Sequence, residues 1–304
     1  MNTLQYFLCL MIVLLFAVPA GAASPAPRAE AGKAVSIGDF SVVPLLDGVH
    51  GFALDLFKGA DEATMLKVAG APSVPGSFNV FLIKRGKERF LVDTGNGMLR
   101  PERIGQLPLC LKDAGTAPED ISKILITHLH GDHIGGLVKD GKPVFLKAKV
   151  YVARSEYDYW TSDEAVRQTP ESRRGGFAPA REVLRVLEQS KLLVLFTPGD
   201  ELFPDITSVA LPGHTPGHTG FMLTSKGKKL FFVGDLLHGA ALQMPRPDIT
   251  VDFDVDQPLA RETRLRAFKQ LAEDKTPIAG AHLPFPGIAL VRPDGDGYKL
   301  EKVQ

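Results

Sequence analysis

The sequence is poor in cysteine, with two in 304 residues. Cys9 lies in an apolar run at the N-terminus, so the rest of the chain has only Cys110 and cannot form an internal disulfide. The apolar core must therefore stabilise the fold without covalent help. The leucines around Cys110 favour a buried small hydrophobic residue over a catalytic thiol.

An excess of charge is also missing, because 35 Lys and Arg balance 35 Asp and Glu. Proteins that bind nucleic acid usually carry a basic surface against the phosphates. The basic residues between Arg261 and Lys269 are interspersed with acidic ones such as Glu262, which indicates a solvated helix face. We therefore expect no nucleic-acid partner.

Only one long apolar run occurs, from Phe7 to Val18, and it is shorter than the roughly 20 residues of a membrane span. Pro19 and the small residues Ala20 to Ala23 follow it, as at a signal-peptide cleavage site. We predict a signal peptide over 1–23, a flexible leader over 24–36 and one domain over 37–304. The mature chain is then exported, to the periplasm or the medium, without a stable membrane span. An uncleaved anchor is the alternative, because no Lys or Arg precedes the run.

Apolar periodicity predicts a mixed α/β organisation with two similar halves. Strands are predicted at 40–46, 79–83, 89–92, 121–127, 150–152, 192–196, 209–211, 220–223, 230–233 and 278–279. Helices are predicted at 103–114, 155–162, 179–189 and 258–272. Asp47-Gly48 is interpreted as a turn and 51–76 as an irregular loop.

The segment from Thr127 to His133 concentrates metal-binding side chains, with three of the chain's eight histidines. His128 and His130 are two residues apart at the end of a predicted strand, so they point the same way and can share one metal. Asp132 and His133 follow in the next turn and can face a second metal. Imidazole and carboxylate are ligands that Zn²⁺ and similar ions take.

Four further candidates follow predicted strands. His214 and His218 lie in a loop rich in Gly and Pro, Asp235 ends an apolar strand, and His282 repeats that arrangement. A carboxylate just past a buried strand is costly unless it is paired or bound to metal. The same argument favours a metal role for Asp235 over a structural one.

This pattern resembles the metal-binding motif of the metallo-β-lactamase superfamily, from Asp93-Thr94-Gly95 to His282. The resemblance implies an α/β fold, the αβ/βα four-layer sandwich. It assigns one metal to His128, His130 and His214. It assigns the second to Asp132, His133 and His282, with Asp235 bridging. It implies that Asp93 orients a ligand histidine and that His218 is not a ligand.

Within the superfamily the chain looks most like methyl parathion hydrolases and lactonase-like relatives. The segments that carry this likeness are 38–40, 46–48, 126–128 and 281–287. The resemblance implies two divalent cations, Zn²⁺ first, with Mn²⁺, Co²⁺ or Fe²⁺ also fitting the ligands. A hydroxide bridging the metals would attack the substrate, oriented by Asp132 and Asp235. A homodimer is expected from the resemblance alone.

The substrate is expected to be a small ester, lactone or phosphotriester. His238 occupies the position where related lactonases carry Tyr and methyl parathion hydrolases an aliphatic residue. A hydrogen bond from His238 to a developing oxyanion favours lactone or aryl-ester hydrolysis, with phosphotriester turnover as a side activity. The alternative is that His238 only packs beside the ligands. Trp160, Phe57 and Phe253 are predicted to line an aromatic pocket, with ordinary core packing as the alternative.

Other activities remain as alternatives. A class B-type β-lactamase suits an exported protein. A thioesterase of the glyoxalase II type needs a C-terminal helical domain, for which the tail after His282 is short. A di-iron redox scaffold usually has an acidic residue where His130 stands. A metal-binding scaffold without turnover predicts lost ligand positions, and all seven are present.

Overall fold

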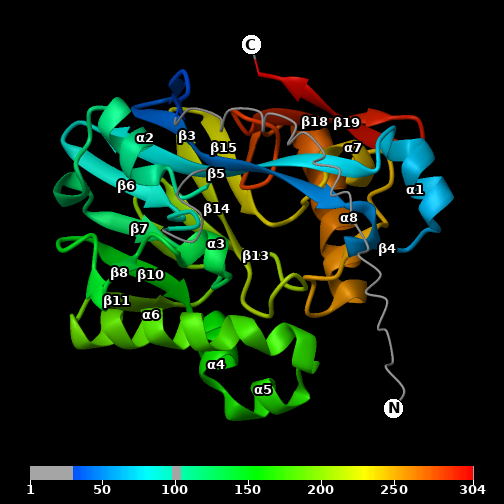
Figure 1. The fold of residues 1–304 in the computed structure, drawn as a ribbon. Coiled ribbons are helices and arrows are strands. Elements are labelled where there is room, and N and C mark those ends of the chain that lie inside the picture. The colour runs from blue at the N-terminus through cyan, green and yellow to red at the C-terminus, as the bar shows by residue number, and fades with distance from the viewer. Residues whose placement is uncertain (1–29, 98–103, 304) are drawn as a thin grey trace, which may run out of the picture.

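The computed structural model describes residues 30–97 and 104–303 of the chain (Figure 1). The predicted signal peptide over 1–23 lies outside these residues. Within them, no helix is both long and apolar enough to cross a membrane. The described part is built around two large sheets.

The first sheet has strand order β1-β3-β5-β6-β7-β10-β11, with β2 paired to β3. The links β6–β7, β7–β10 and β10–β11 are parallel, and those from β1 to β6 are antiparallel. Its strands are β1 (Glu30–Ala31), β2 (Val35–Ile37), β3 (Phe40–Ala53), β5 (Ser73–Arg85), β6 (Glu88–Val92), β7 (Lys123–Leu125), β10 (Lys149–Ala153) and β11 (Leu193–Phe196).

The second sheet has the order β12-β13-β14-β15-β17-β18-β19, and only β15–β17 is parallel. Its strands are β12 (Glu201–Phe203), β13 (Ile206–Ala210), β14 (Thr219–Ser225), β15 (Lys228–Gly234), β17 (Ile278–Gly280), β18 (Ile288–Asp294) and β19 (Gly297–Lys302). Two small pairs complete the strands: β4 (Phe57–Lys58) with β16 (Thr250–Val251), and β8 (Val138–Lys139) with β9 (Lys142–Pro143).

Alternating side chains bury both faces of the first sheet. In β3, Val42 packs between the two sheets, whereas Val43 packs toward the outer helices. On the inner face Phe81 meets Phe232 of β15 at a ring-centroid distance of 5.5 Å. The strands of this sheet are continuous apolar runs in the sequence, because both of its faces are buried.

Helices cover the outer faces, which gives four layers in the order αβ/βα. Figure 1 shows α4 and α6 beside β10 and β11, and α8 against the other sheet. The helices are α1 (Glu62–Ala69), α2 (Leu107–Asp113), α3 (Gly131–Ile134), α4 (Arg154–Thr161), α5 (Asp163–Gln168), α6 (Phe177–Gln189), α7 (Ala240–Gln243) and α8 (Gln257–Asp274). Three 3₁₀ turns are η1 (Leu54–Leu56), η2 (Pro118–Asp120) and η3 (Glu171–Gly176).

The prediction for residues 47–76 was wrong. Asp47-Gly48 is a bulge inside β3 and not a turn, because the register with β5 shifts there and the strand continues to Ala53. The bulge lets the buried Asp47 carboxylate accept hydrogen bonds from the backbone N–H groups of Asn96, Gly105 and Leu107. The supposed loop over 51–76 holds the rest of a long β3–β5 hairpin, with α1 at its end.

Two boundaries also differ. Residues 30–37, placed largely in the flexible leader over 24–36, form β1 and β2, because β3 offers them an unpaired edge. Residues 24–29 lie outside the described part. The helix predicted over 103–114 is α2, which begins at Leu107. The backbone N–H of Leu107 is held there by Asp47, and residue 103 lies outside the described part.

Candidate metal centre

The edge where the two sheets meet collects the histidines and aspartates singled out in the sequence. His128 and His130 follow β7, and Asp132 and His133 lie in α3. The remaining three come from the second half, in the loops after β13, β15 and β17: His214, Asp235 and His282. The backbone N–H of Thr219 in β14 donates to Thr127 O at 2.9 Å, which joins the second sheet to the loop after β7.

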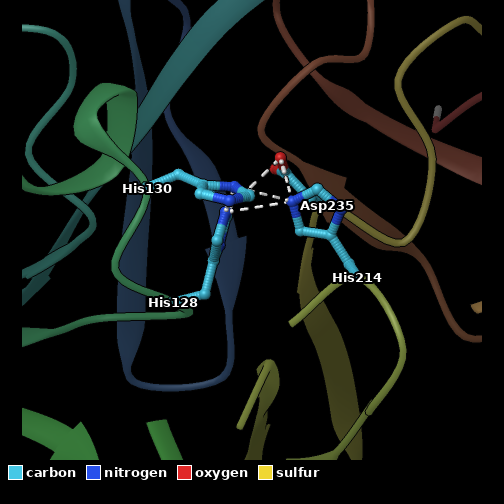
Figure 2. A group of neighbouring side chains, drawn as sticks. All are labelled: His128, His130, His214 and Asp235. Carbon is cyan, nitrogen blue, oxygen red and sulfur yellow. Dashed lines mark hydrogen bonds and ion pairs between the residues drawn. The ribbon is translucent and has the colours of Figure 1, made fainter. Parts of the chain in front are cut away.

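One group of ligand atoms is formed by His128, His130, His214 and Asp235, whose side chains point at one another (Figure 2). His128 Nε2 lies 2.9 Å from His130 Nδ1, and His214 Nε2 lies 3.2 and 3.0 Å from these two atoms. Each ring nitrogen carries either one proton or one lone pair. Among three nitrogens at least two are therefore of the same kind, and those two cannot form a hydrogen bond with each other. Nitrogens bound to one tetrahedral Zn²⁺ lie roughly 3.3 Å apart, so a cation fits this triangle.

A second group consists of Asp132, His133 and His282. Asp132 Oδ2 lies 3.6 Å from His133 Nε2 and 3.5 Å from His282 Nε2. Asp235 faces both groups. Its Oδ1 is 3.2 Å from His133 Nε2, and its Oδ2 is 3.3 Å from His214 Nε2. One carboxylate therefore stands between two sets of ligand atoms.

Buried polar atoms without hydrogen-bond partners gather at the same place. Among the described residues they include His133 Nε2, Asp235 Oδ1 and His238 Nδ1. An unsatisfied buried polar group is expensive unless something in the site compensates it. The donor set, the convergence and these atoms all fit two divalent cations.

The ligand rings are held by contacts on their far nitrogens. Asp93 Oδ2 lies 2.8 Å from His133 Nδ1, in the orienting position that the resemblance implied for this carboxylate. Asp254 Oδ1 lies 2.9 Å from His214 Nδ1. Such partners fix the ring orientation and the tautomer. Asp254 was missed in the sequence because its role depends on a fold contact with residue 214, 40 positions away.

Burial and neighbouring charges shift the pKa values of the side chains at the centre in opposite directions. Burial, reinforced by the neighbouring His214, lowers the pKa of His130 to about 3. Burial also favours the neutral form of His214. Hydrogen bonds to Asp235 and Asp254 outweigh it and raise the pKa of His214 to about 9. Burial opposes ionisation of Asp132 and Asp235, yet nearby imidazoles hold both pKa values below the usual range. Metal ligation needs ionised carboxylates and neutral imidazoles, so a cation that binds here displaces the proton of His214.

His218 supports the centre without facing it. Its Nδ1 bonds Leu211 O at 2.9 Å, and its Nε2 accepts from the backbone N–H of Asp235 at 3.0 Å. Gly234 precedes Asp235 with φ 51°, and a Cβ there would approach His218 Nε2 to 2.5 Å. A glycine is therefore needed to turn Asp235 into the centre.

A buried carboxylate that the sequence analysis did not single out joins the two ligand loops. Glu156 Oε1 accepts from Leu129 N at 2.9 Å and from Trp160 Nε1 at 2.6 Å. Its Oε2 accepts from Thr215 Oγ1 at 2.7 Å and from Gly217 N at 2.9 Å. Leu129 stands between two ligand histidines and Thr215 directly follows a third, so Glu156 sets the spacing between the loops.

A cavity of about 520 Å³ opens onto the centre. Trp160 and Phe253 line it, as predicted, together with Asp132, Asp235 and His238. The prediction for Phe57 was wrong: it does not line the cavity and is fully buried where β4 pairs with β16. The sequence analysis missed Phe52 and Phe78, which also line the cavity. Phe52 fell in the segment taken for a loop, and Phe78 lay just before the strand predicted from residue 79.

His238 lies within the cluster of ligand atoms. Its Nε2 is 3.0 Å from Asp235 Oδ2, and its ring stacks at 5.0 Å on that of His282. Burial lowers the pKa of His238 to about 4, so the ring is neutral at pH 7. Gln243 Oε1 accepts from its backbone N–H at 2.8 Å and steadies the loop.

The family model described as the metallo-beta-lactamase superfamily matches residues 74–282 of this chain. The chain belongs to the metallo-beta-lactamase superfamily. The match covers the segment from the β3–β5 hairpin to His282, which contains every ligand candidate. The four-layer fold agrees with that of solved members.

Two solved structures are similar over about nine-tenths of this chain. The hydrolase AbOPH is 30% identical with a TM-score of 0.85, over 91% of this chain and 98% of AbOPH. AidC, a dizinc quorum-quenching lactonase in complex with a product, is 28% identical with a TM-score of 0.83, over 90% of this chain and 98% of AidC. An N-acyl homoserine lactonase of a Bacillus species is 30% identical over 38% of each chain. The chain spans 20% to 58% of the length of the curated relatives it matches.

Proposed function

We propose that this metallo-beta-lactamase superfamily hydrolase opens lactones and aryl esters at a binuclear metal centre, with phosphotriesters as side substrates. The observation that carries the proposal is one carboxylate, Asp235, standing between two groups of ligand atoms at the base of an aromatic cavity. The likeness to AidC, a dizinc lactonase, supports a lactone as the substrate class.

The first cation is assigned to His128, His130 and His214, and the second to Asp132, His133 and His282, with Asp235 shared. Zn²⁺ suits this set of imidazoles and carboxylates, and Mn²⁺, Co²⁺ or Fe²⁺ are compatible with it. When bound, two divalent cations polarise the reacting oxygen and make water nucleophilic near pH 7.

The residues of the chain position and polarise the substrate. Asp132 lies in the cavity wall with 26% of its side chain exposed, so its carboxylate can orient the attacking water. His238 is neutral at pH 7, and because its Nε2 faces Asp235 Oδ2 at 3.0 Å its one N–H lies on Nε2. We assign this N–H to the oxygen that gains negative charge once Asp235 is shared by the cations. Phe52 and Phe78 pack edge-on against the His282 ring and keep bulk water from the apolar part of the substrate. Export and a homodimer remain predictions from the sequence.

The test compares initial rates of the zinc-loaded protein on dihydrocoumarin, methyl parathion and nitrocefin. We expect the lactone to lead, and we expect Asp235→Ala and chelated protein to lose activity by more than about 10³-fold. Asp158→Ala, an exposed aspartate of α4, is the matched control and should keep full activity. A lead by the phosphotriester or by nitrocefin would replace the substrate class. Full activity in Asp235→Ala or after chelation would remove the metal mechanism.

A further inference from the structure

The cavity wall carries one cationic side chain that the proposed reaction does not use. Arg173 lies in η3 and lines the cavity together with Trp160 and Phe253. It is the only Lys or Arg among the described residues that line the cavity. About a third of its side chain, 36%, is exposed. A cation at the wall of an apolar cavity can set which substrates enter.

The guanidinium of Arg173 is only partly used by the protein. Its Nη1 donates to Asp254 O at 3.1 Å, and its Nη2 lies 3.7 Å from Asp252 Oδ1, beyond hydrogen-bond distance. A guanidinium has five N–H donors in a planar fork. Most of these donors therefore have no acceptor among the described residues.

The carboxylate of Asp252 pairs more closely with Lys58 than with Arg173. Lys58 Nζ lies 3.1 Å from Asp252 Oδ2, closer than Arg173 lies to Oδ1. The three side chains together carry a net charge of +1. The other carboxylates of the cavity, Asp132 and Asp235, face the ligand histidines. This part of the wall therefore offers an uncompensated positive charge.

We propose that Arg173 is an anion subsite, and that the favoured substrates are esters or lactones whose chain ends in a carboxylate remote from the bond that is broken. The apolar wall between the metal centre and Arg173 takes the chain. A single guanidinium matches one monoanionic carboxylate through two parallel N–H···O bonds. The inference rests on the proposed function, because it describes the substrate of the same cavity.

A structural role for Arg173 has to be separated from this one. Its bond to Asp254 O joins η3 to the loop after β16, so its removal can also loosen the wall. The adjacent Arg174 provides the matched control, because it donates to Thr169 O and Arg167 O and does not line the cavity. The variants are Arg173→Gln, Arg174→Gln and Arg173→Lys.

The first readout is binding, which needs no turnover. The chain has a single tryptophan, and Trp160 lines the cavity, so its fluorescence reports occupancy. The zinc-loaded protein is titrated with the monohexylamide of adipic acid and with N-hexylhexanamide. These two amides have equal chain lengths and differ only in a terminal carboxylate or methyl group.

We expect the acidic amide to bind roughly five- to tenfold more tightly than the neutral one. Arg173→Gln should abolish this preference, Arg173→Lys should keep part of it, and Arg174→Gln should leave it unchanged. Equal binding to the unmodified protein, or no binding of either amide, would overturn the subsite. A preference that survives in Arg173→Gln would place the carboxylate at the metals, and it too would overturn the subsite.

The second readout is hydrolysis of 4-nitrophenyl monoadipate against 4-nitrophenyl hexanoate. Arg173→Gln should lower kcat/KM for the acidic ester roughly five- to tenfold, mainly through KM, and change the neutral ester by less than about twofold. Equal losses on both esters would assign Arg173 a structural role only. If neither ester nor any lactone turns over while the binding preference stands, the proposed function fails and the subsite remains.

Discussion

Replacement of Glu156 by Gln tests how the two halves of the metal centre are held together. Gln has the shape of Glu, but one of its two oxygens becomes an NH₂ group. The Glu156 carboxylate accepts four hydrogen bonds, two at each oxygen, and it is buried. Burial raises the pKa of this carboxyl, and the four donors act against that rise.

The cost follows from the two orientations open to the amide. With its nitrogen at the Oε1 position, the amide meets the N–H groups of Leu129 and Trp160, and neither can turn into an acceptor. With its nitrogen at the Oε2 position, it meets Thr215, whose hydroxyl can rotate to accept, and Gly217 N–H, which cannot. The second orientation is the less costly and leaves one buried donor facing another. We expect a loss of about 2–4 kcal/mol in the free energy of unfolding.

Thermal unfolding with and without zinc is the assay. For a chain of this size the loss corresponds to a decrease in Tm of roughly 5–10 °C. Both ligand loops donate hydrogen bonds to this carboxylate, so its loss should also change their spacing. We therefore expect zinc affinity to fall by about tenfold in a competition titration with a chelator. Glu188→Gln is the control, since Glu188 is exposed and accepts one bond from Tyr157. An unchanged Tm and zinc affinity in Glu156→Gln would refute the idea that Glu156 sets the spacing of the loops.

Three further predictions concern single side chains. Asp93→Ala should weaken zinc binding about 10- to 100-fold in chelator competition, because His133 loses the partner of its Nδ1, and unchanged affinity would count against that role. His238→Phe should lower kcat on dihydrocoumarin about 10²-fold with two zinc ions still bound, whereas unchanged kcat would mean that His238 only packs. Burial raises the pKa of the Cys110 thiol to about 11, so at pH 8 little thiolate forms. In a Cys9→Ser background Cys110 should react with a thiol reagent only after unfolding, and rapid reaction of the native protein would contradict its burial.

The sequence was most informative where ligands cluster along the chain. His128, His130 and His133 fall in one hexapeptide, and strand-to-loop geometry alone brings them together. The three ligand candidates of the second half were found because each follows an apolar strand. The αβ/βα sandwich was implied by the same motif, and long periodic helices such as α6 and α8 were found to within about two residues.

The sequence analysis failed where a tertiary contact overrode a local signal. Asp47-Gly48 is a strong turn dipeptide, yet it forms a bulge because the Asp47 carboxylate is held by three backbone N–H groups from another segment. The resemblance to relatives placed both Phe57 and Phe253 in the pocket. Only the packing of β4 on β16 separates them, burying the first and leaving the second 37% exposed at the cavity.

The sequence by itself determined the family, the ligand types and the chemistry open to the centre, because these depend on side-chain identity and local spacing. Tertiary structure decided which partners orient the ligands and what lines the cavity. Glu156 and Asp254 show the reason. A buried carboxylate takes its role from donors brought to it by distant segments, and those pairings exist only once the two halves have packed together.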